Sequence, residues 1–344
     1  MRQKNQKEAR IIAAAESNRR WWKWAALILL LAAAAALLIF QFEEPLRRRF
    51  QGVKAGVTLR GRSVEYLLPD EVNAIVGEIA QHEGREAVSA QIDLDKERII
   101  PELNGLAVDR ESTVELVMKA RPGEQLNPIY SELYPPICWS QYPALPAEQG
   151  NPRKPCVALM INVAWGEEEL PGMLRVLQEE QAGATFFLVG RWAEKNGPLI
   201  EEIAAGGHEL GNHGYSDNET FPQLDAWSSA RSIRQTNEIV FDAVGCYPRY
   251  FTPHKGEFSP LTLEIVSRQG MRTVLWSLDT VDWQKPGVAR MKEKIMSNLE
   301  PGQIILMHPT ADTVQLLVEI LPLIRAKGLA VVTVGELLEP GWWQ

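Results

Sequence analysis

The chain has 344 residues, a formal net charge of −8 at pH 7, and 45% hydrophobic and 23% charged residues. The acidic balance and the lack of a long basic run in the body of the chain exclude nucleic acid as a predicted partner. The length allows one large domain and a small one. Cys138, Cys156 and Cys246 lack metal-ligand spacing and are predicted to be structural thiols, with a Cys138–Cys156 bridge as the alternative outside the cell.

The N-terminal part of the chain contains one long uncharged segment, residues 24–42, which reads WAALILLLAAAAALLIFQF. At about 1.5 Å rise per residue, a helix of this length nearly spans a hydrocarbon core of about 30 Å. The basic leader, residues 1–23, outweighs Arg47–Arg49 on the far side. This asymmetry predicts a single-pass anchor in the cell membrane, with a cytoplasmic N-terminus and an extracytoplasmic body. A cleaved signal peptide is the alternative, because residues 32–36 are all alanine.

Residues 53–135 are predicted to form a small α+β domain. GVTLRG, VSAQIDLD and IIPELNGLAVD read as short strands, whereas residues 69–81 and 109–120 have helical periodicity. The phrase IPELNGLAVD, followed by a helix and an Ala-Arg-Pro-Gly turn, is similar to small peptidoglycan-binding modules of Gram-positive bacteria. A spacer that holds the next domain off the membrane is the alternative. Residues 136–155 are rich in proline and indicate a linker or an extended strap.

From residue 156 to residue 340, short apolar runs alternate with helical segments. The runs are VALMINVAW, ATFFLVG, RYFT, RTVLWSL, QIILMH and LAVVTV, and several of the helices between them end in glycine. Buried runs that alternate with helices predict an α/β fold with a parallel sheet, open or closed as a barrel. Catalytic groups in such folds gather at the carboxyl ends of the strands.

Five polar segments follow or end the predicted strands of this region. They are Asn162–Gly166 (NVAWG), Gly207–Asp217 (GHELGNHGYSD), Phe251–Phe258 (FTPHKGEF), Trp276–Trp283 (WSLDTVDW) and Ile305–His308 (ILMH). In this order and spacing they closely resemble the polysaccharide deacetylase family, also called carbohydrate esterase family 4. The resemblance implies a distorted (β/α) barrel that removes N-acetyl groups from amino sugars of chitin or peptidoglycan. It also implies a divalent metal, usually zinc, held by one Asp and two His.

Part of the site that the resemblance implies is retained. His308 matches the family's general acid, and Asp282, in preference to Asp279, matches the carboxylate that tunes it. Trp283 and Leu306 match residues that line the acetyl pocket. Read without the resemblance, the same residues are compatible with a packed strand end and a packed turn.

The position of the general base is substituted. The family's first motif has two adjacent aspartates, of which the first is the base and the second a metal ligand; Asn162 and Val163 stand there. An amide does not take a proton from water near neutral pH, and valine has no lone pair. Thr252 stands where the family has the arginine that orients the base. These coupled losses predict reduced or absent catalysis.

The metal site is altered as well. His213 matches the family's first histidine ligand, but Asp217 stands four residues later in place of the second. His254, at a substrate-binding position of the third motif, adds a nitrogen if its loop reaches inward. Catalytic zinc usually needs three protein ligands and an open position. The sequence therefore predicts no bound metal, with zinc held by His213, Asp217 and His254 as the alternative. If its segment is extended, His208 faces away from His213 and does not share this site.

Two main functions follow from this pattern. The first is a non-catalytic descendant, or pseudoenzyme, that keeps the glycan groove and binds cell-wall polymer (peptidoglycan) or a partner protein. The second is an active N-deacetylase, an amide hydrolase, in which Asp217 or His308 serves as the base. The Asn162–Val163 substitution favours the first. A membrane-tethered spacer is a third reading, and the phrase INVAWG resembles a branch of the family from spore-forming bacteria, which implies a role in sporulation or the cell wall.

Overall fold

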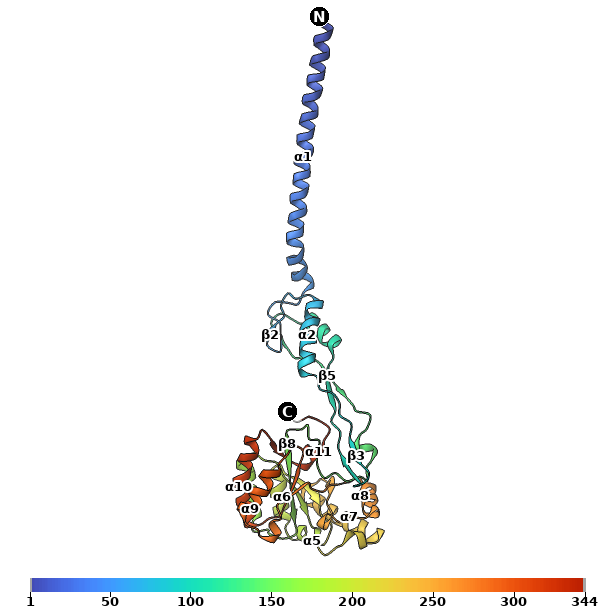
Figure 1. Cartoon of the computed structure of the whole chain (residues 1–344), viewed down its shortest axis with the longest axis vertical. Coiled ribbons are helices and arrows are strands. Elements are labelled where there is room, and N and C mark those ends of the chain that lie inside the picture. The colour runs from blue at the N-terminus through green and yellow to red at the C-terminus, as the bar shows by residue number, and fades with distance from the viewer. Residues whose placement is uncertain (1, 343–344) are drawn as a thin grey trace. The chain divides into compact units, whose positions relative to one another are not determined.

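A computed structural model describes residues 2–342, apart from the side chains of residues 2–20, 23 and 38. The chain divides into two compact units, and some elements of each are labelled in Figure 1. The first unit comprises Met1–Arg85 and Leu106–Ser131, and the second comprises Glu86–Gly105 and Glu132–Gln344. The two units are therefore interleaved along the chain.

The first unit begins with the long helix α1 (Arg2–Gln51). Its part from Trp24 to Gln51 is long and apolar enough to cross a membrane, and large apolar side chains on it, such as Leu29 and Phe40, are exposed. Exposed apolar area of this extent is unfavourable in water. A membrane anchor and a signal sequence would both account for such a helix.

The rest of the first unit packs two helices against a small sheet. The helices α2 (Pro69–Glu83) and α3 (Arg110–Lys119) form where helical periodicity predicts them. Asp109 caps α3 by accepting a hydrogen bond from the Ser112 backbone N–H at 3.0 Å. The sheet contains β1 (Thr58–Leu59), β2 (Arg62–Ser63) and β6 (Gln125–Leu126). Another short pair is β5 (Gly105–Val108) with β7 (Tyr130–Leu133). The pair of β3 (Gln91–Asp93) with β4 (Arg98–Ile100) belongs to the second unit.

The second unit is built on an eight-stranded sheet in the order β12-β11-β10-β9-β8-β14-β13, with β15 also paired to β8. Every pairing in this sheet is parallel. The curled parallel sheet confirms the predicted distorted (β/α) barrel. The strands are β8 (Cys156–Val163), β9 (Thr185–Leu188), β10 (Glu209–Asn212), β11 (Tyr250–Phe251), β12 (Arg272–Thr273), β13 (Leu278–Asp279), β14 (Ile304–Met307) and β15 (Ala330–Val332).

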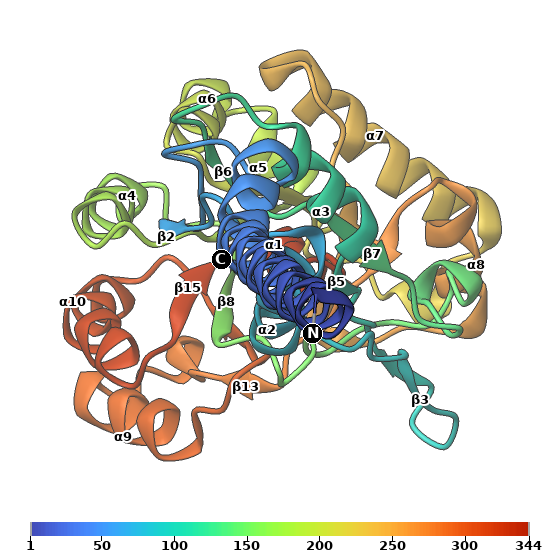
Figure 2. The same ribbon diagram turned by 90° about the horizontal axis from the view of Figure 1, so that it is seen from above.

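Helices of the second unit are set around these strands (Figure 2). The α-helices are α4 (Leu170–Glu179), α5 (Gly190–Ala193), α6 (Gly197–Ala205), α7 (Ala226–Val244), α8 (Pro260–Arg268), α9 (Val288–Asn298), α10 (Ala311–Ala326) and α11 (Val334–Leu338). Short 3₁₀ turns are η1 (Trp139–Gln141), η2 (Phe221–Gln223), η3 (His254–Gly256) and η4 (Asp282–Gln284).

Alternation along β8 divides the core into two layers. Odd-numbered residues from Val157 to Val163 pack in the cluster that contains the apolar faces of α4 and α10. Even-numbered residues such as Ala158 and Met160 pack in a second cluster with Phe187 and Leu306, on the other face of the sheet. Side chains alternate between the two faces of a strand. Asn162 therefore belongs to the inner face, whereas Val163 belongs to the helix-facing layer.

The proline-rich segment before β8 is part of the second unit and contacts its strands and α11. Ala147 pairs with Val274, and the fully enclosed Lys154 donates hydrogen bonds to the backbone carbonyls of Glu336, Leu337 and Glu339 at 2.7, 3.1 and 2.6 Å. These carbonyls belong to the C-terminal end of α11, where helices leave acceptors unpaired. Lys154 therefore ties the start of β8 to α11. The three cysteines are free thiols.

Candidate active site

Side chains from four parallel strands meet at the carboxyl edge of the sheet. His308 follows β14, Asn162 and Val163 end β8, His213 follows β10, and Thr252 follows β11. Because these strands run parallel, their carboxyl ends share one edge. Four segments that are far apart in sequence are thereby drawn into one region.

A buried carboxylate fixes the orientation of His308. Asp282, of which only 1% is exposed, lies 2.8 Å from His308 Nδ1 through Oδ1, and its Oδ2 accepts the His308 backbone N–H at 2.6 Å. Thr313 of α10 donates a third hydrogen bond to Oδ2 at 2.9 Å. The carboxylate places the proton of the neutral ring on Nδ1, which leaves Nε2 with a free lone pair. Asp279 instead accepts the Val281 backbone N–H at 2.7 Å.

Two tryptophans stand beside this His–Asp pair. The Trp165 ring is stacked on His308, with centroids 6.0 Å apart and an interplanar angle of 9°. Trp165 is 44% exposed and Trp283 is 58% exposed, and both line a cavity of about 480 Å³ whose wall includes Asp282. A cavity of this size suits a small organic ligand.

A buried histidine pair lies nearby. The rings of His213 and His254 are 4.1 Å apart between centroids, and His213 Nδ1 lies 2.7 Å from the backbone carbonyl oxygen of Thr252. Burial, followed by the charge of His254, holds the pKa of His213 well below its usual range, and the charge of His308 acts in the same direction. Burial also lowers the pKa of His254, against the opposing charges of Glu219 and Asp217. Both rings are therefore neutral near pH 7.

Three buried polar atoms in this region lack a hydrogen-bond partner within the described part of the chain: Asn162 Oδ1, Thr252 Oγ1 and His254 Nε2. Orphaned polar atoms cost free energy unless water or a ligand satisfies them, and they cluster at functional sites. Val163, by contrast, is fully buried among apolar side chains of the helix-facing layer.

The family model for polysaccharide deacetylase matches residues 149–274. The uncharacterised protein YlxY of Bacillus subtilis is 37% identical over 240 residues, which cover 70% of this chain and 75% of that protein. A peptidoglycan-N-acetylglucosamine deacetylase of Bacillus cereus is 31% identical over 209 residues, which cover 59% of this chain and 75% of that protein. The chain belongs to the polysaccharide deacetylase family.

Solved structures of this family include a pseudoenzyme of carbohydrate esterase family 4 from Bacillus anthracis. The wild-type structure has a TM-score of 0.68 and 29% sequence identity, and the match covers 79% of this chain and 96% of that one. A mutant of that pseudoenzyme, described as having restored enzymatic activity, has the same TM-score and 28% identity, and the match covers 79% of this chain and 99% of the mutant. The structural likeness extends over most of both chains.

Polysaccharide deacetylases are metal-dependent, and the donor set of this member differs from the one that a metal needs. In the described part of the chain, no group of three His, Cys, Asp or Glu side chains is arranged to hold a metal ion. His213 and His254 offer two ring nitrogens, but Asp217 is exposed in the loop after β10. Val163 contributes only apolar contacts. The residues present do not fit the three-ligand site that catalytic zinc requires.

Two further residues that the sequence singled out, Leu306 and His208, lie apart from the polar side chains described above. Leu306 is buried in the inner cluster with Phe187, and His208 packs against the Phe186 ring at 5.4 Å between centroids. Trp165 and Thr313 were not among the predicted site residues. The indole of Trp165 follows Asn162 by three positions in the first family segment, which was a usable signal. Thr313 lies inside a helix, and nothing in its local sequence indicates a contact with Asp282.

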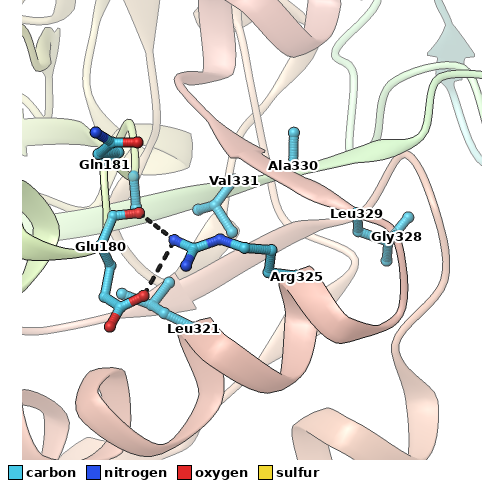
Figure 3. A pocket seen from close by; sticks show the side chains of 9 residues that line it. Glu180, Gln181, Leu321, Arg325, Gly328, Leu329, Ala330 and Val331 are labelled. Carbon is cyan, nitrogen blue, oxygen red and sulfur yellow. Dashed lines mark hydrogen bonds and ion pairs between the residues drawn. The ribbon is translucent and has the colours of Figure 1, made fainter.

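A separate cavity of about 350 Å³ is lined by the residues that follow α4, by the C-terminal part of α10 and by the start of β15 (Figure 3). Its main polar feature is Arg325, which pairs with the Glu180 carboxylate at 3.0 Å and bonds the Glu180 carbonyl oxygen. This is the amino end of the strands, opposite the edge where α/β enzymes place their chemistry. The cavity is therefore distinct from the candidate active site.

Proposed function

We propose that this member of the polysaccharide deacetylase family binds N-acetylated cell-wall glycan and has little or no deacetylase activity. The observation that carries the proposal is the pair of residues at the carboxyl end of β8. Asn162 stands on the inner face where the family places its base, and Val163 is turned into the helix-facing apolar layer. An amide is not a general base near neutral pH.

The retained half of the site supports glycan binding. The His308–Asp282 pair, the exposed Trp165 and Trp283 side chains, and the cavity between them remain at the carboxyl edge of the sheet. Relatives named peptidoglycan-N-acetylglucosamine deacetylases point to peptidoglycan as the polymer. Similarity to a structurally characterised pseudoenzyme supports weak or absent catalysis.

The alternative is an active N-deacetylase with an altered site, and the His308–Asp282 pair favours it. Asp282 leaves the Nε2 lone pair of His308 available, so this ring has the geometry of a general base. In this alternative His308 replaces the lost carboxylate at position 162. The competing functions differ in acetate release but not in glycan binding.

The test is a joint measurement on the purified full-length protein. We expect far less than one zinc per chain after dialysis, because Val163 and the exposed Asp217 leave the ligand set incomplete. Acetate release from peptidoglycan or chito-oligosaccharide should stay at background, while the protein cosediments with insoluble peptidoglycan. Stoichiometric zinc, or turnover on the order of one per second, would contradict the non-catalytic function. Failure to cosediment would contradict glycan binding.

We also propose that α1 anchors the protein in the cell membrane, with the C-terminal body outside the cytoplasm. The uncharged stretch from Trp24 to Phe42 and its basic leader support this orientation. Protease added to intact protoplasts should digest the body of the protein and leave a short membrane-bound fragment. A cytoplasmic protein should stay intact as the control. Full protection of the body until the membrane is lysed would contradict the orientation.

A further inference from the structure

We infer that the solvent-facing side of α7 is a docking surface for a second copy of this chain, which binds with its own α7 antiparallel to the first. The inference does not depend on glycan binding. The helix lies at the outer edge of the second unit (Figure 2). Its buried side chains, such as Ile233 and Val240, pack in the core clusters of that unit. Its other side is open to solvent.

The solvent-facing side of α7 carries one continuous row of exposed side chains, which we call the α7 stripe. At about 3.6 residues per turn its members fall within an arc of about 100°, and at about 1.5 Å rise per residue the stripe is roughly 22 Å long. The members are Trp227, Arg231, Arg234, Glu238, Phe241 and Asp242.

Both ends of the α7 stripe expose aromatic surface. Trp227 is 65% exposed, and the Arg231 guanidinium lies over its ring at 5.2 Å from the centroid. At the other end the Phe241 ring is stacked on that of Tyr247, with centroids 4.4 Å apart and an interplanar angle of 17°, and both side chains are exposed. Aromatic residues and arginine are enriched in protein–protein interfaces. Covering these rings with another protein surface would remove apolar area from water.

The charges of the α7 stripe are separated along the helix. Arg231 and Arg234 lie in its N-terminal half, whereas Glu238 and Asp242 lie in its C-terminal half. Within the part of the chain that the structure describes, the side chains of Arg234, Glu238 and Asp242 form no hydrogen bond or ion pair. Asp242 lies in the last turn, where a negative charge opposes the helix dipole. The stability of α7 by itself therefore does not account for this order of charges.

A second copy of the chain supplies the complement to this order. A two-fold interface uses the same patch on both chains, so the patch has to be complementary to itself. In an antiparallel pair of α7 helices, the arginine half of each stripe faces the acidic half of the other, and Trp227 comes close to Phe241 of the second copy. A parallel pair would bring like charges together. The stripe is shorter than the interfaces of permanent dimers, so the association should be weak and reversible.

Charge reversal in the full-length protein tests this pairing, with detergent present because α1 exposes apolar side chains. The first variant, Arg231→Glu with Arg234→Glu, makes the stripe acidic throughout. The second, Glu238→Arg with Asp242→Arg, makes it basic throughout. Sedimentation velocity should show a concentration-dependent dimer for the wild type and at least a tenfold weaker dimer for each variant alone. An equimolar mixture of the two variants should dimerise at least as well as the wild type, because opposite charges then face each other.

The matched control is Arg175→Glu with Arg290→Glu, which makes the same change in charge as the first variant on exposed arginines of α4 and α9. It should dimerise like the wild type. Trp227→Ala should weaken the dimer severalfold without lowering the unfolding temperature. A wild-type protein that stays monomeric at every concentration would overturn the inference. So would reversed variants that dimerise as well alone as the wild type does, since the copies would then associate through another surface, such as α1.

Discussion

The variant that combines Asn162→Asp, Val163→Asp, Asp217→His and Thr252→Arg is expected to gain zinc binding and to release acetate from chito-oligosaccharide. The four changes return the base, the two missing ligands and the residue that orients the base. A positioned general base alone typically contributes about 10²–10⁴ in rate. Groups that act as a unit are strongly non-additive, so each single change should leave acetate release near background.

The structure identifies the difficult positions in this variant. Val163 is fully buried in the helix-facing layer, where a carboxylate would be desolvated and its pKa raised. Thr252 is also fully buried, so arginine there has to displace neighbouring atoms. We therefore expect the variant to unfold at a lower temperature than the parent. Bound metal should raise the unfolding temperature of the variant part of the way back to that of the parent, because a ligand that binds only the folded state stabilises it.

A matched control separates restored chemistry from contamination. Adding His308→Asn to the quadruple variant removes the ring nitrogen next to Asp282 and should abolish the gained acetate release, while zinc binding persists. A quadruple variant that folds and binds zinc but releases no acetate would show that the groove no longer positions substrate. A parent protein that already releases acetate at an enzymatic rate would refute the non-catalytic function outright.

The substitution Lys154→Met is expected to destabilise the fold strongly, although Lys154 lies outside the site. Lys154 is 1% exposed, and its ammonium donates to three backbone carbonyls near the end of α11. Methionine keeps the apolar stem but leaves these acceptors unpaired. Hydrogen bonds to a charged group and orphaned buried acceptors together predict a loss of about 2–4 kcal/mol in the free energy of unfolding. For a domain of this size the melting temperature should fall by about 5–15 °C.

Differential scanning calorimetry or thermal circular dichroism measures this effect. The control is Lys195→Met, because Lys195 is an exposed lysine of the same unit, and its loss should change stability by less than about 0.5 kcal/mol. Equal melting temperatures for Lys154→Met and the wild type would mean that the three carbonyls find other partners. Glycan binding should be unaffected in either lysine variant, since both residues lie outside the cavity of Trp165 and Trp283.

Much of the fold was predictable because apolar runs and helix-start residues in the local sequence determine its strands and helices. The run from Cys156 to Val163 is apolar throughout and forms a strand buried on both faces, as expected of a parallel sheet. Asp109 and Pro69 mark helix starts through capping and a fixed φ, and α3 and α2 begin at these positions. The polar segments at the strand ends were enough to indicate the deacetylase family, because their order and spacing resemble the motifs of that family.

The sequence by itself also determined which chemical groups the site lacks. Asn162 and Val163 replace two carboxylates whatever their surroundings are, since an amide and an isopropyl group cannot be made basic by a fold. Only the tertiary structure decided where the remaining groups go. It turned Val163 into the helix-facing layer, stacked Trp165 on His308, left Asp217 exposed, and brought Thr313 to Asp282 across 31 positions of sequence. Such contacts depend on how strands curl and where loops end, and no local periodicity encodes that geometry.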